Sequence, residues 1–394
     1  MSENENAEAP APAAPAPEFD LETPDIPLPE ILEKAEIKDQ FETAFKFAII
    51  GSGQGGSRLA ESFYTLGYRR VCAINSTEQD LANIKLPAEN KFCIGSGGAG
   101  KNPAVAAALF AERREDVLDF MSRSFGPVFN RIFVCIGAGG GTGAGTVSGL
   151  VQTAHDLQIA VKCPDNKVGV IVALPKNSEG KKVNENAYNT LSELIAHVKN
   201  GVVSPLIILD NERISQIFPG LAVDPFWATA NNSVVSLLNL FNTVSTKNST
   251  YTTFDPNDFK MLLDSGVIVF GATPVKKWDS ATDISLAVRD NLKRNIISGG
   301  IDLSTGSVAA AVVIGGKGIL STVPAEYIDH AYDQLTRLLR PGSTVHRGIY
   351  SGSKETLVVY TVIGGLESPA AKLDELRKLG DVVINPANGG RSES

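Results

Sequence analysis

The sequence contains no run of about 18 apolar residues, the length that a membrane-spanning helix requires. Its first 20 residues lack the basic start and apolar core of a secretory signal. The four cysteines form no CxxC pair, and the four histidines form no HxxxH or HExxH pattern. These absences argue against a disulfide framework and a zinc site, and they predict a cytoplasmic protein with free thiols.

Basic residues are too few and too scattered for a nucleic-acid-binding surface, so we expect no direct contact with nucleic acid. The net charge is −8, and residues 1–40 contain eleven acidic residues and two lysines, which leaves +1 for the rest of the chain. The acidic stretch 1–42 is rich in Ala and Pro and has little apolar surface to bury, which predicts a disordered leader. It is either a spacer or a docking segment for an adaptor protein.

Apolar runs alternate with amphipathic stretches after the leader, a pattern typical of an α/β protein with a mostly parallel sheet. The predicted strands of this part are 45–50, 70–75, 131–136, 167–174 and 206–209, and the predicted helices are 31–47, 58–66, 102–120, 142–157 and 185–198. A long helix is predicted over 224–248, because apolar side chains recur on one face. A smaller α+β unit follows, with strands at 266–271, 308–315 and 357–363, helices at 284–296 and 326–339, and a final helix at 370–379.

The chain length of 394 residues suggests about two domains. We divide the chain into the leader 1–42, a larger α/β domain 43–223, a central helix and linker 224–252, a smaller domain 253–366, and a short helix with a polar tail 367–394.

The strongest signal for a ligand is GAGGGTGAG at residues 137–145, which follows a predicted strand and opens a predicted helix. Glycines allow the backbone to approach a ligand closely, and successive N–H groups at a helix start form an anion-binding nest. A tight strand–helix turn alone rarely needs so many glycines. The segment therefore predicts a polyphosphate-binding loop with Thr142 as its one hydroxyl.

Two further glycine-rich loops have rival interpretations. GSGQGG at 51–56 fits the dinucleotide pattern GxGxxG, but the next strand ends in Asn75 and not in an acidic residue that would hold a ribose, which disfavours a nicotinamide oxidoreductase. The stretch 95–101 nearly matches a Walker loop, yet Asn102 replaces the hydroxyl that would bind Mg²⁺. It stays a candidate phosphate contact, because its glycines lead into a helix start near Pro103.

Taken in order, these loops resemble those of the tubulin/FtsZ superfamily, whose signature is commonly written GGGTG[ST]G. The segments that carry the resemblance are GSGQGGSR at 51–58, AINSTEQDL at 73–81, GGAGKNP at 97–103, GAGGGTGAG at 137–145, LPKNSEG at 174–180, LDN at 209–211, WATANNSV at 227–234 and TFDPNDFK at 253–260. The resemblance covers roughly residues 45–366. The sequences of the first loop and of LPKNSEG are also close to those of the archaeal CetZ branch. A divergent plasmid or phage tubulin homologue is the other option.

The resemblance implies a site for GTP or GDP in the larger domain, with Mg²⁺ at the phosphates and no protein ligand assigned to the metal. The nucleotide-binding residues that it implies are Gly51, Gly53, Gln54, Gly55, Gly56, Asn75, Gly98, Ala99, Gly100, Ala138, Gly139, Gly140, Gly141, Thr142, Gly143, Pro175, Glu179, Asn211, Trp227, Asn231 and Asn232. Glu179 would contact the ribose, Trp227 would stack on guanine, and the two asparagines of the central helix would face the base edge.

The resemblance also implies that the smaller domain activates hydrolysis in a neighbouring subunit, through Asp255 and Asp258. A carboxylate can accept a proton from water and help to place it for attack. The alternative for Asp255 and Asp258 is a helix-capping role. The implied contact is head-to-tail and therefore propagates into a homopolymer when the rotation does not close.

Three positions depart from the family pattern: Val183 replaces an arginine, Thr253 an asparagine, and Asn232 a frequent aspartate. Lys181 or Lys182 is a candidate substitute for the missing arginine. These departures motivate an alternative function, an assembly-competent nucleotide-binding paralogue with little hydrolysis. Cell shape, division, plasmid segregation and phage genome positioning stay open as biological roles, and adaptor proteins would dock on the tails.

Overall fold

A computed structural model describes residues 37–383. Residues 1–36 and 384–394 lie outside the described part, and with them most of the predicted leader and the end of the predicted polar tail.

The helix predicted over 31–47 is wrong for the residues that the structure describes. Residues 37–46 form no helix, and Phe47 begins the first strand. Phe41 and Phe45 instead hold this segment against the body, with ring centroids 5.1 Å from Tyr68 and 5.9 Å from Phe259, respectively. These contacts to distant residues outweigh the local helical preference.

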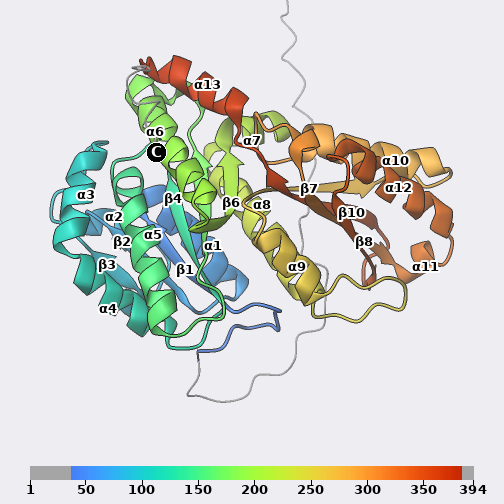
Figure 1. Cartoon of the computed structure of the whole chain (residues 1–394), viewed down its shortest axis with the longest axis horizontal. Coiled ribbons are helices and arrows are strands. Elements are labelled where there is room, and N and C mark those ends of the chain that lie inside the picture. The colour runs from blue at the N-terminus through green and yellow to red at the C-terminus, as the bar shows by residue number, and fades with distance from the viewer. Residues whose placement is uncertain (1–36, 384–394) are drawn as a thin grey trace, which may run out of the picture.

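One ten-stranded sheet runs through the molecule in the order β3-β2-β1-β4-β5-β6-β7-β10-β8-β9 (Figure 1). The strands are β1 Phe47–Ser52, β2 Val71–Asn75, β3 Lys91–Cys93, β4 Arg131–Gly137, β5 Val168–Leu174, β6 Val203–Asp210, β7 Val267–Val275, β8 Val308–Gly316, β9 Thr344–Gly352 and β10 Leu357–Leu366. The pairs from β3 to β7 are parallel, whereas β10 is antiparallel to both of its neighbours. The predicted class, a parallel α/β part, a long central helix and an α+β part, is confirmed.

Helices cover both faces of this sheet, because successive side chains of each strand point to opposite faces. The helices are α1 Gly53–Leu66, α2 Glu78–Ala82, α3 Pro103–Glu112, α4 Arg114–Phe125, α5 Thr142–Ala160, α6 Lys181–Lys199, α7 Asn211–Ile217, α8 Val223–Val244, α9 Pro256–Leu263, α10 Ala281–Asp290, α11 Lys317–Leu320, α12 Ala325–Leu338 and α13 Ala370–Gly380. In β1, Ala48 and Ile50 pack in the core with α4, α5 and α6, whereas Phe47 and Ile49 pack with α1, α8 and α9.

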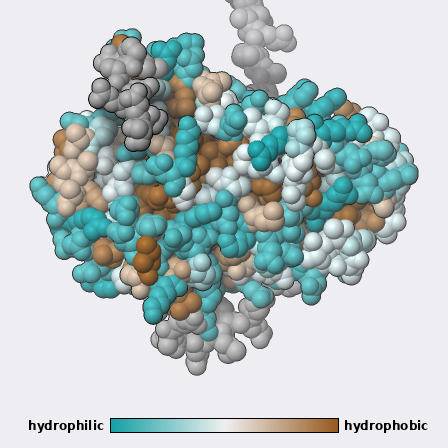
Figure 2. Space-filling view, in the orientation of Figure 1, coloured by the Kyte–Doolittle hydropathy of each residue, from teal (hydrophilic) through white to brown (hydrophobic). Residues whose placement is uncertain are grey.

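The surface in the orientation of Figure 1 is mostly hydrophilic, with hydrophobic residues in small groups (Figure 2). Among the described residues, no helix combines the length and the apolar character needed to cross a membrane.

The prediction of one continuous helix over 102–120 is wrong, because the structure has two helices there, α3 and α4. They meet at Arg113, which has φ −110° and ψ 14°. The Arg113 guanidinium lies 5.0 Å from the Phe92 ring centroid and 2.5 Å from the Asp116 carboxylate. The contact with Phe92, on β3, is tertiary, so the helical period alone does not reveal the break.

The helix predicted over 284–296 ends early, at Asp290, and continues as a π-helical turn over Asn291–Asn295. The buried Asn291 amide donates to the Val359 carbonyl at 3.2 Å and accepts from the Thr361 hydroxyl at 3.2 Å. Both partners belong to β10, so hydrogen bonds to the sheet determine where the α-helix ends.

Strand β9 has no counterpart among the predictions. Its sequence, TVHRGIYSG, mixes charged, polar and glycine residues and lacks the alternation of a half-buried strand. It forms because it pairs with β8 along its whole length, at the edge of the sheet.

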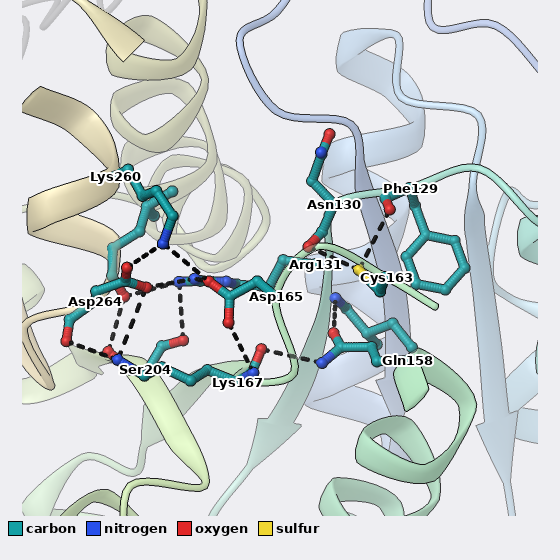
Figure 3. Close-up of polar contacts among 12 residues, drawn as sticks. Phe129, Asn130, Arg131, Gln158, Cys163, Asp165, Lys167, Ser204, Lys260 and Asp264 are labelled. Carbon is teal, nitrogen blue, oxygen red and sulfur yellow. Dashed lines mark hydrogen bonds and ion pairs between the residues drawn. The ribbon is translucent and has the colours of Figure 1, made fainter. Parts of the chain in front are cut away.

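A buried arginine ties the α/β part of the molecule to α9. Arg131, the first residue of β4, is only 3% exposed and donates to the carbonyls of Ser204 (3.1 Å) and Leu263 (2.8 Å). It also pairs with Asp264 at 2.6 Å and with Asp165. Figure 3 shows these groups gathered around the guanidinium, with β4, β6 and α9 each contributing. The C-terminal end of α9 is thereby fixed at the amino ends of the parallel strands.

Replacing Arg131 with methionine should destabilise the fold by about 3 kcal/mol, because two carboxylates would lose their buried partner. Burial raises the pKa of Asp165, but the Arg131 guanidinium beside it holds that pKa below its ordinary value of 3.8. The Asp165 contribution is therefore present above pH 3.8 and is lost as the pH falls through the lower pKa of the folded state. Thermal unfolding from pH 7 to pH 3 measures both effects. The matched exposed variant Arg113→Met should change stability by under about 1 kcal/mol, and equal losses in the two variants would contradict this account.

Candidate functional site

A cavity of about 440 Å³ opens at the carboxyl ends of β1, β4 and β5. It is lined by sixteen of the residues predicted to bind nucleotide, namely Gly53, Gln54, Gly55, Gly98, Ala99, Gly100, Gly139, Gly140, Gly141, Thr142, Gly143, Pro175, Glu179, Asn211, Trp227 and Asn231. Segments up to 178 residues apart in sequence, from Gly53 to Asn231, thus meet in one place. Ligands of parallel α/β sheets bind at this end of the strands.

Five predicted binding residues, Gly51, Gly56, Asn75, Ala138 and Asn232, do not line the cavity. A Cβ on Gly51 would lie 2.3 Å from the Gly56 carbonyl oxygen, and one on Gly56 would lie 2.1 Å from the Cys135 carbonyl oxygen. These glycines therefore permit close backbone packing under the loop. Ala138 is fully buried, and Asn232 is exposed on α8 outside the cavity.

Asn75 organises the cavity wall from behind. Its Oδ1 accepts from the Ser76 backbone N–H at 2.8 Å, and its amide donates to Asp80 at 3.2 Å. The hydroxyls of Ser76 and Thr142 lie 2.7 Å apart. These contacts join the end of β2 to the first residue of α5, so the two loops form one surface.

Two helix starts at the cavity have no side-chain cap. Helix α1 begins at Gly53 and α5 at Thr142, and neither has an N-cap hydrogen bond or an acidic residue in its first turn. The first N–H groups of a helix need partners, and the helix dipole favours negative charge there. Two such starts facing one cavity are suited to a polyphosphate.

The third glycine loop is held tightly against the signature loop. A Cβ on Gly141 would lie 2.8 Å from the Ala99 side chain, so only glycine permits this approach. The Asn186 amide donates to the carbonyls of Gly139 (3.2 Å) and Lys101 (3.0 Å). Lys101 has φ +60°, an unusual backbone conformation for a residue with a side chain. Asn186 thus fixes the positions of the two loops relative to each other.

Two cationic side chains, those of Arg58 and Lys101, also line the cavity. Neither was predicted to bind the nucleotide. Arg58 lies four residues after Gln54, on the same face of α1, and that spacing was the available signal. Lys181 and Lys182, the suggested substitutes for the missing arginine, pair instead with Asp381 and Glu185, at 2.7 Å and 3.1 Å.

The far end of the cavity is suited to an aromatic base. Trp227 lines it, and the Phe226 ring packs against Trp227 edge-to-face with centroids 5.2 Å apart. The Lys176 ammonium lies 3.7 Å from the Phe226 ring centroid and so joins the loop after β5 to α8. Asn211 is 4% exposed, and within the described residues its Oδ1 has no hydrogen-bond partner. A buried oxygen without a partner favours a ligand donor in the bound state.

The loop after β5 is also held by the C-terminal helix α13. The Asn177 amide donates to Glu375 at 2.6 Å, and the buried Lys372 pairs with Asp210 at 3.2 Å and with Glu375 at 3.0 Å. Burial raises the pKa of Asp210, although the Lys372 ammonium opposes this shift. Asp210 also caps α7, whose first residue is Asn211. Helix α13 therefore supports the cavity wall, and local sequence gave no signal of this contact.

The chemistry of the lining residues fits a Mg²⁺ ion carried mainly by phosphate oxygens. Asp80 supplies one carboxylate, and Ser76 and Thr142 supply hydroxyls. No group of three or more His, Cys, Asp or Glu residues that could hold a metal occurs in the described part of the chain. Mg²⁺ commonly binds through one or two carboxylates, substrate phosphates and water.

The two acidic residues expected to act in hydrolysis lie at the opposite end of the molecule from the cavity. Trp227, near the start of α8, lines the cavity, whereas Phe241, near its end, packs on Phe254 with ring centroids 5.7 Å apart. Trp227 and Phe241 are 14 positions apart on α8, which corresponds to about 21 Å of helix. Asp255 follows Phe254 directly, so it cannot reach the cavity of its own chain.

Asp255 and Asp258 form a capping box at the start of α9. Asp255 Oδ1 accepts from the Asp258 N–H at 2.9 Å, and Asp258 Oδ2 accepts from the Asp255 N–H at 3.0 Å. The expected helix-capping role is therefore present for both residues. Asp255 is exposed, and within the described residues its Oδ2 receives no hydrogen bond, so this oxygen can still act on water.

The arrangement of glycine loops and uncapped helix starts around a cavity that is also lined by Trp227 defines an α/β nucleotide-binding protein. The Tubulin/FtsZ family, GTPase domain, matches residues 46–219. Residues 46–219 thus form a domain of the Tubulin/FtsZ GTPase type, and this family of domains implies binding of GTP and GDP.

Proteins named CetZ, FtsZ and TubZ are among those to which the chain is similar. The chain is 28% identical over 335 residues to the tubulin-like protein CetZ of Thermococcus kodakarensis, with 81% of each chain covered. It is 24% identical over 367 residues to the cell division protein FtsZ 1 of the same organism, covering 89% of this chain and 90% of the relative. A GTPγS-form protofilament structure of TubZ from Bacillus thuringiensis serovar israelensis has the same fold, with a TM-score of 0.75 at 20% identity over 86% of this chain and 92% of that chain.

Proposed function

We propose that this protein is a GTP-dependent, self-assembling cytoskeletal protein whose GTPase site is completed by a second copy. The separation of the cavity from Asp255 along α8 is the observation that carries this proposal. A head-to-tail contact would place the α9 start of one subunit over the cavity of the next, and such contacts extend into filaments. The TubZ structure with the same fold is a protofilament, which supports self-assembly of this chain.

In this proposal the cavity holds the nucleotide in one orientation. The phosphates lie at the starts of α1 and α5, where backbone N–H groups stabilise the charge that develops during hydrolysis. Arg58 and Lys101 supply the cations at this end. The base lies against Trp227, with Asn231 and Asn211 as its polar contacts.

Hydrolysis then requires only that water be held in line with the γ-phosphate. Asp255 of the neighbouring subunit accepts a hydrogen bond from this water and orients it for attack, and Asp258 keeps Asp255 in place. Asp80, Ser76 and Thr142 would help to hold a Mg²⁺ ion at the phosphates, where the ion would supply positive charge. After phosphate leaves, the interface loses the contacts that the γ-phosphate supplied, so hydrolysis weakens the filament.

A second candidate function is a filament that binds nucleotide but hydrolyses it slowly. Val183 lines the cavity and is 6% exposed, so the family's arginine has no replacement at that place. Thr253, which replaces the family's asparagine, accepts from the Ser249 N–H at 3.3 Å. Phosphate release per subunit separates the candidates, because the slow filament would release almost none even when fully assembled.

The experiment that tests assembly is electron microscopy and sedimentation of the full chain with GTP, GDP, ATP or no nucleotide. We expect filaments with GTP that disappear as GTP is consumed, and none with ATP. Identical polymers in all four conditions, or no polymer at any protein concentration with GTP, would remove the proposal. We further propose that the filament acts in the cytoplasm, with adaptor proteins docking on the tails.

A further inference from the structure

Asp258 is held by a histidine from the edge strand of the sheet. His346 lies on β9, opposite Ala310 of β8, and its side chain is 12% exposed. Its Nδ1 is 2.7 Å from Asp258 Oδ1. The other Asp258 oxygen accepts from the Asp255 N–H, so both oxygens are engaged within one subunit.

The tautomer of His346 follows from its surroundings. The ring Nε2 is buried, and among the described residues it has no hydrogen-bond partner. The Phe254 ring is nearby, with centroids 6.5 Å apart. A proton on Nε2 would be a buried donor without an acceptor, which costs about 1–3 kcal/mol. The packing therefore favours the tautomer with the proton on Nδ1, which donates a hydrogen bond to Asp258.

Strand β9 supports the start of α9 at further points. The Tyr350 hydroxyl accepts from the Phe254 N–H at 2.8 Å and lies 3.1 Å from the Phe254 carbonyl oxygen. The Ile349 N–H donates to the Thr252 carbonyl at 2.9 Å. The loop that leads to Asp255 is thus held through its own backbone by Tyr350 and Ile349, whereas His346 contacts the Asp258 carboxylate.

We propose that His346 is a positioning residue for hydrolysis, acting through Asp258. This inference rests on the proposed function. The hydrogen bond from Nδ1–H fixes the Asp258 carboxylate, which keeps the capping box formed through Asp255 Oδ1 and leaves Asp255 Oδ2 available for water. A carboxylate held in advance spares the cost of ordering it when the two subunits meet.

The test exploits the different reach of two amides, because asparagine places its N–H near the position of Nδ1 and glutamine near that of Nε2. In the full-length chain, His346→Asn should hydrolyse GTP within about twofold of wild type, whereas His346→Gln and His346→Leu should lose about tenfold in kcat. GTP affinity and the critical concentration with a slowly hydrolysed GTP analogue should stay unchanged. In an Asp258→Ala background, His346→Leu should have no further effect.

Equal activity of the asparagine and glutamine variants would overturn the inference, and so would a full effect of His346→Leu without the Asp258 carboxylate. The comparison of the two amides stands even if the leucine variant fails to fold. The Asp255→Ala variant, measured in parallel, distinguishes failure of the His346 inference from failure of the proposed function. If Asp255→Ala hydrolyses GTP at the normal rate, the proposed function fails. If Asp255→Ala loses turnover but all His346 variants hydrolyse GTP at the wild-type rate, only the inference fails.

Discussion

Replacing Asp255 with alanine should lower GTP hydrolysis inside filaments by about 100-fold or more, a typical contribution of a group that positions a proton or water. The cavity lies at the other end of α8, so GTP affinity should stay within twofold of wild type. Filaments should still form with GTP and should persist, because they would retain the γ-phosphate. Phosphate release at saturating GTP, with sedimentation in parallel, measures both properties.

The matched control for this variant is Asp119→Ala. Asp119 is an exposed aspartate on α4, away from the cavity and from α9. Its removal should leave turnover and filament lifetime unchanged. Normal turnover of the Asp255→Ala filament would show that hydrolysis uses groups of the nucleotide-bound subunit alone.

Replacing Gly140 with valine should abolish GTP binding without unfolding the protein. A Cβ at Gly140 would meet no atom within 4 Å, and the residue does not have a positive φ, so the fold tolerates a side chain there. Gly140 nevertheless lines the cavity in the signature loop, so a valine would occupy the place of a phosphate. We expect affinity to fall by at least about 100-fold, or roughly 2.7 kcal/mol, in a fluorescence titration with a labelled GTP.

Gly97→Val is the control for that substitution. Gly97 is also exposed, also without a positive φ, and also without a neighbour within 4 Å of an added Cβ, but it does not line the cavity. Its affinity for GTP should match wild type. If both variants bind GTP normally, the nucleotide lies elsewhere.

The loops of the cavity could be predicted because each carries its own local signal. Glycines after a strand and before a helix fix where the backbone approaches a ligand, whatever the rest of the chain does. The same pattern does not say which glycine faces the ligand. Gly51 and Gly56 belong to the first loop by sequence, yet they face each other and the backbone of β4.

What escaped prediction depends on contacts between distant segments. Strand β9 has a sequence that no strand pattern favours, and it forms through pairing with β8. Lys372 is buried because Asp210, 162 residues earlier, and Glu375 pair with it. Asn232, assigned to the base edge by resemblance, is exposed and does not line the cavity, so its contact with the base stays a prediction.

The measurement that tests the central claim most directly is the rate of GTP hydrolysis per subunit across a wide range of protein concentrations. A site built from two subunits predicts almost no hydrolysis at concentrations too low for assembly and a steep rise above a threshold. That threshold should coincide with the appearance of filaments by sedimentation. A specific activity that is constant down to the most dilute solution, where no assembly occurs, would contradict the account.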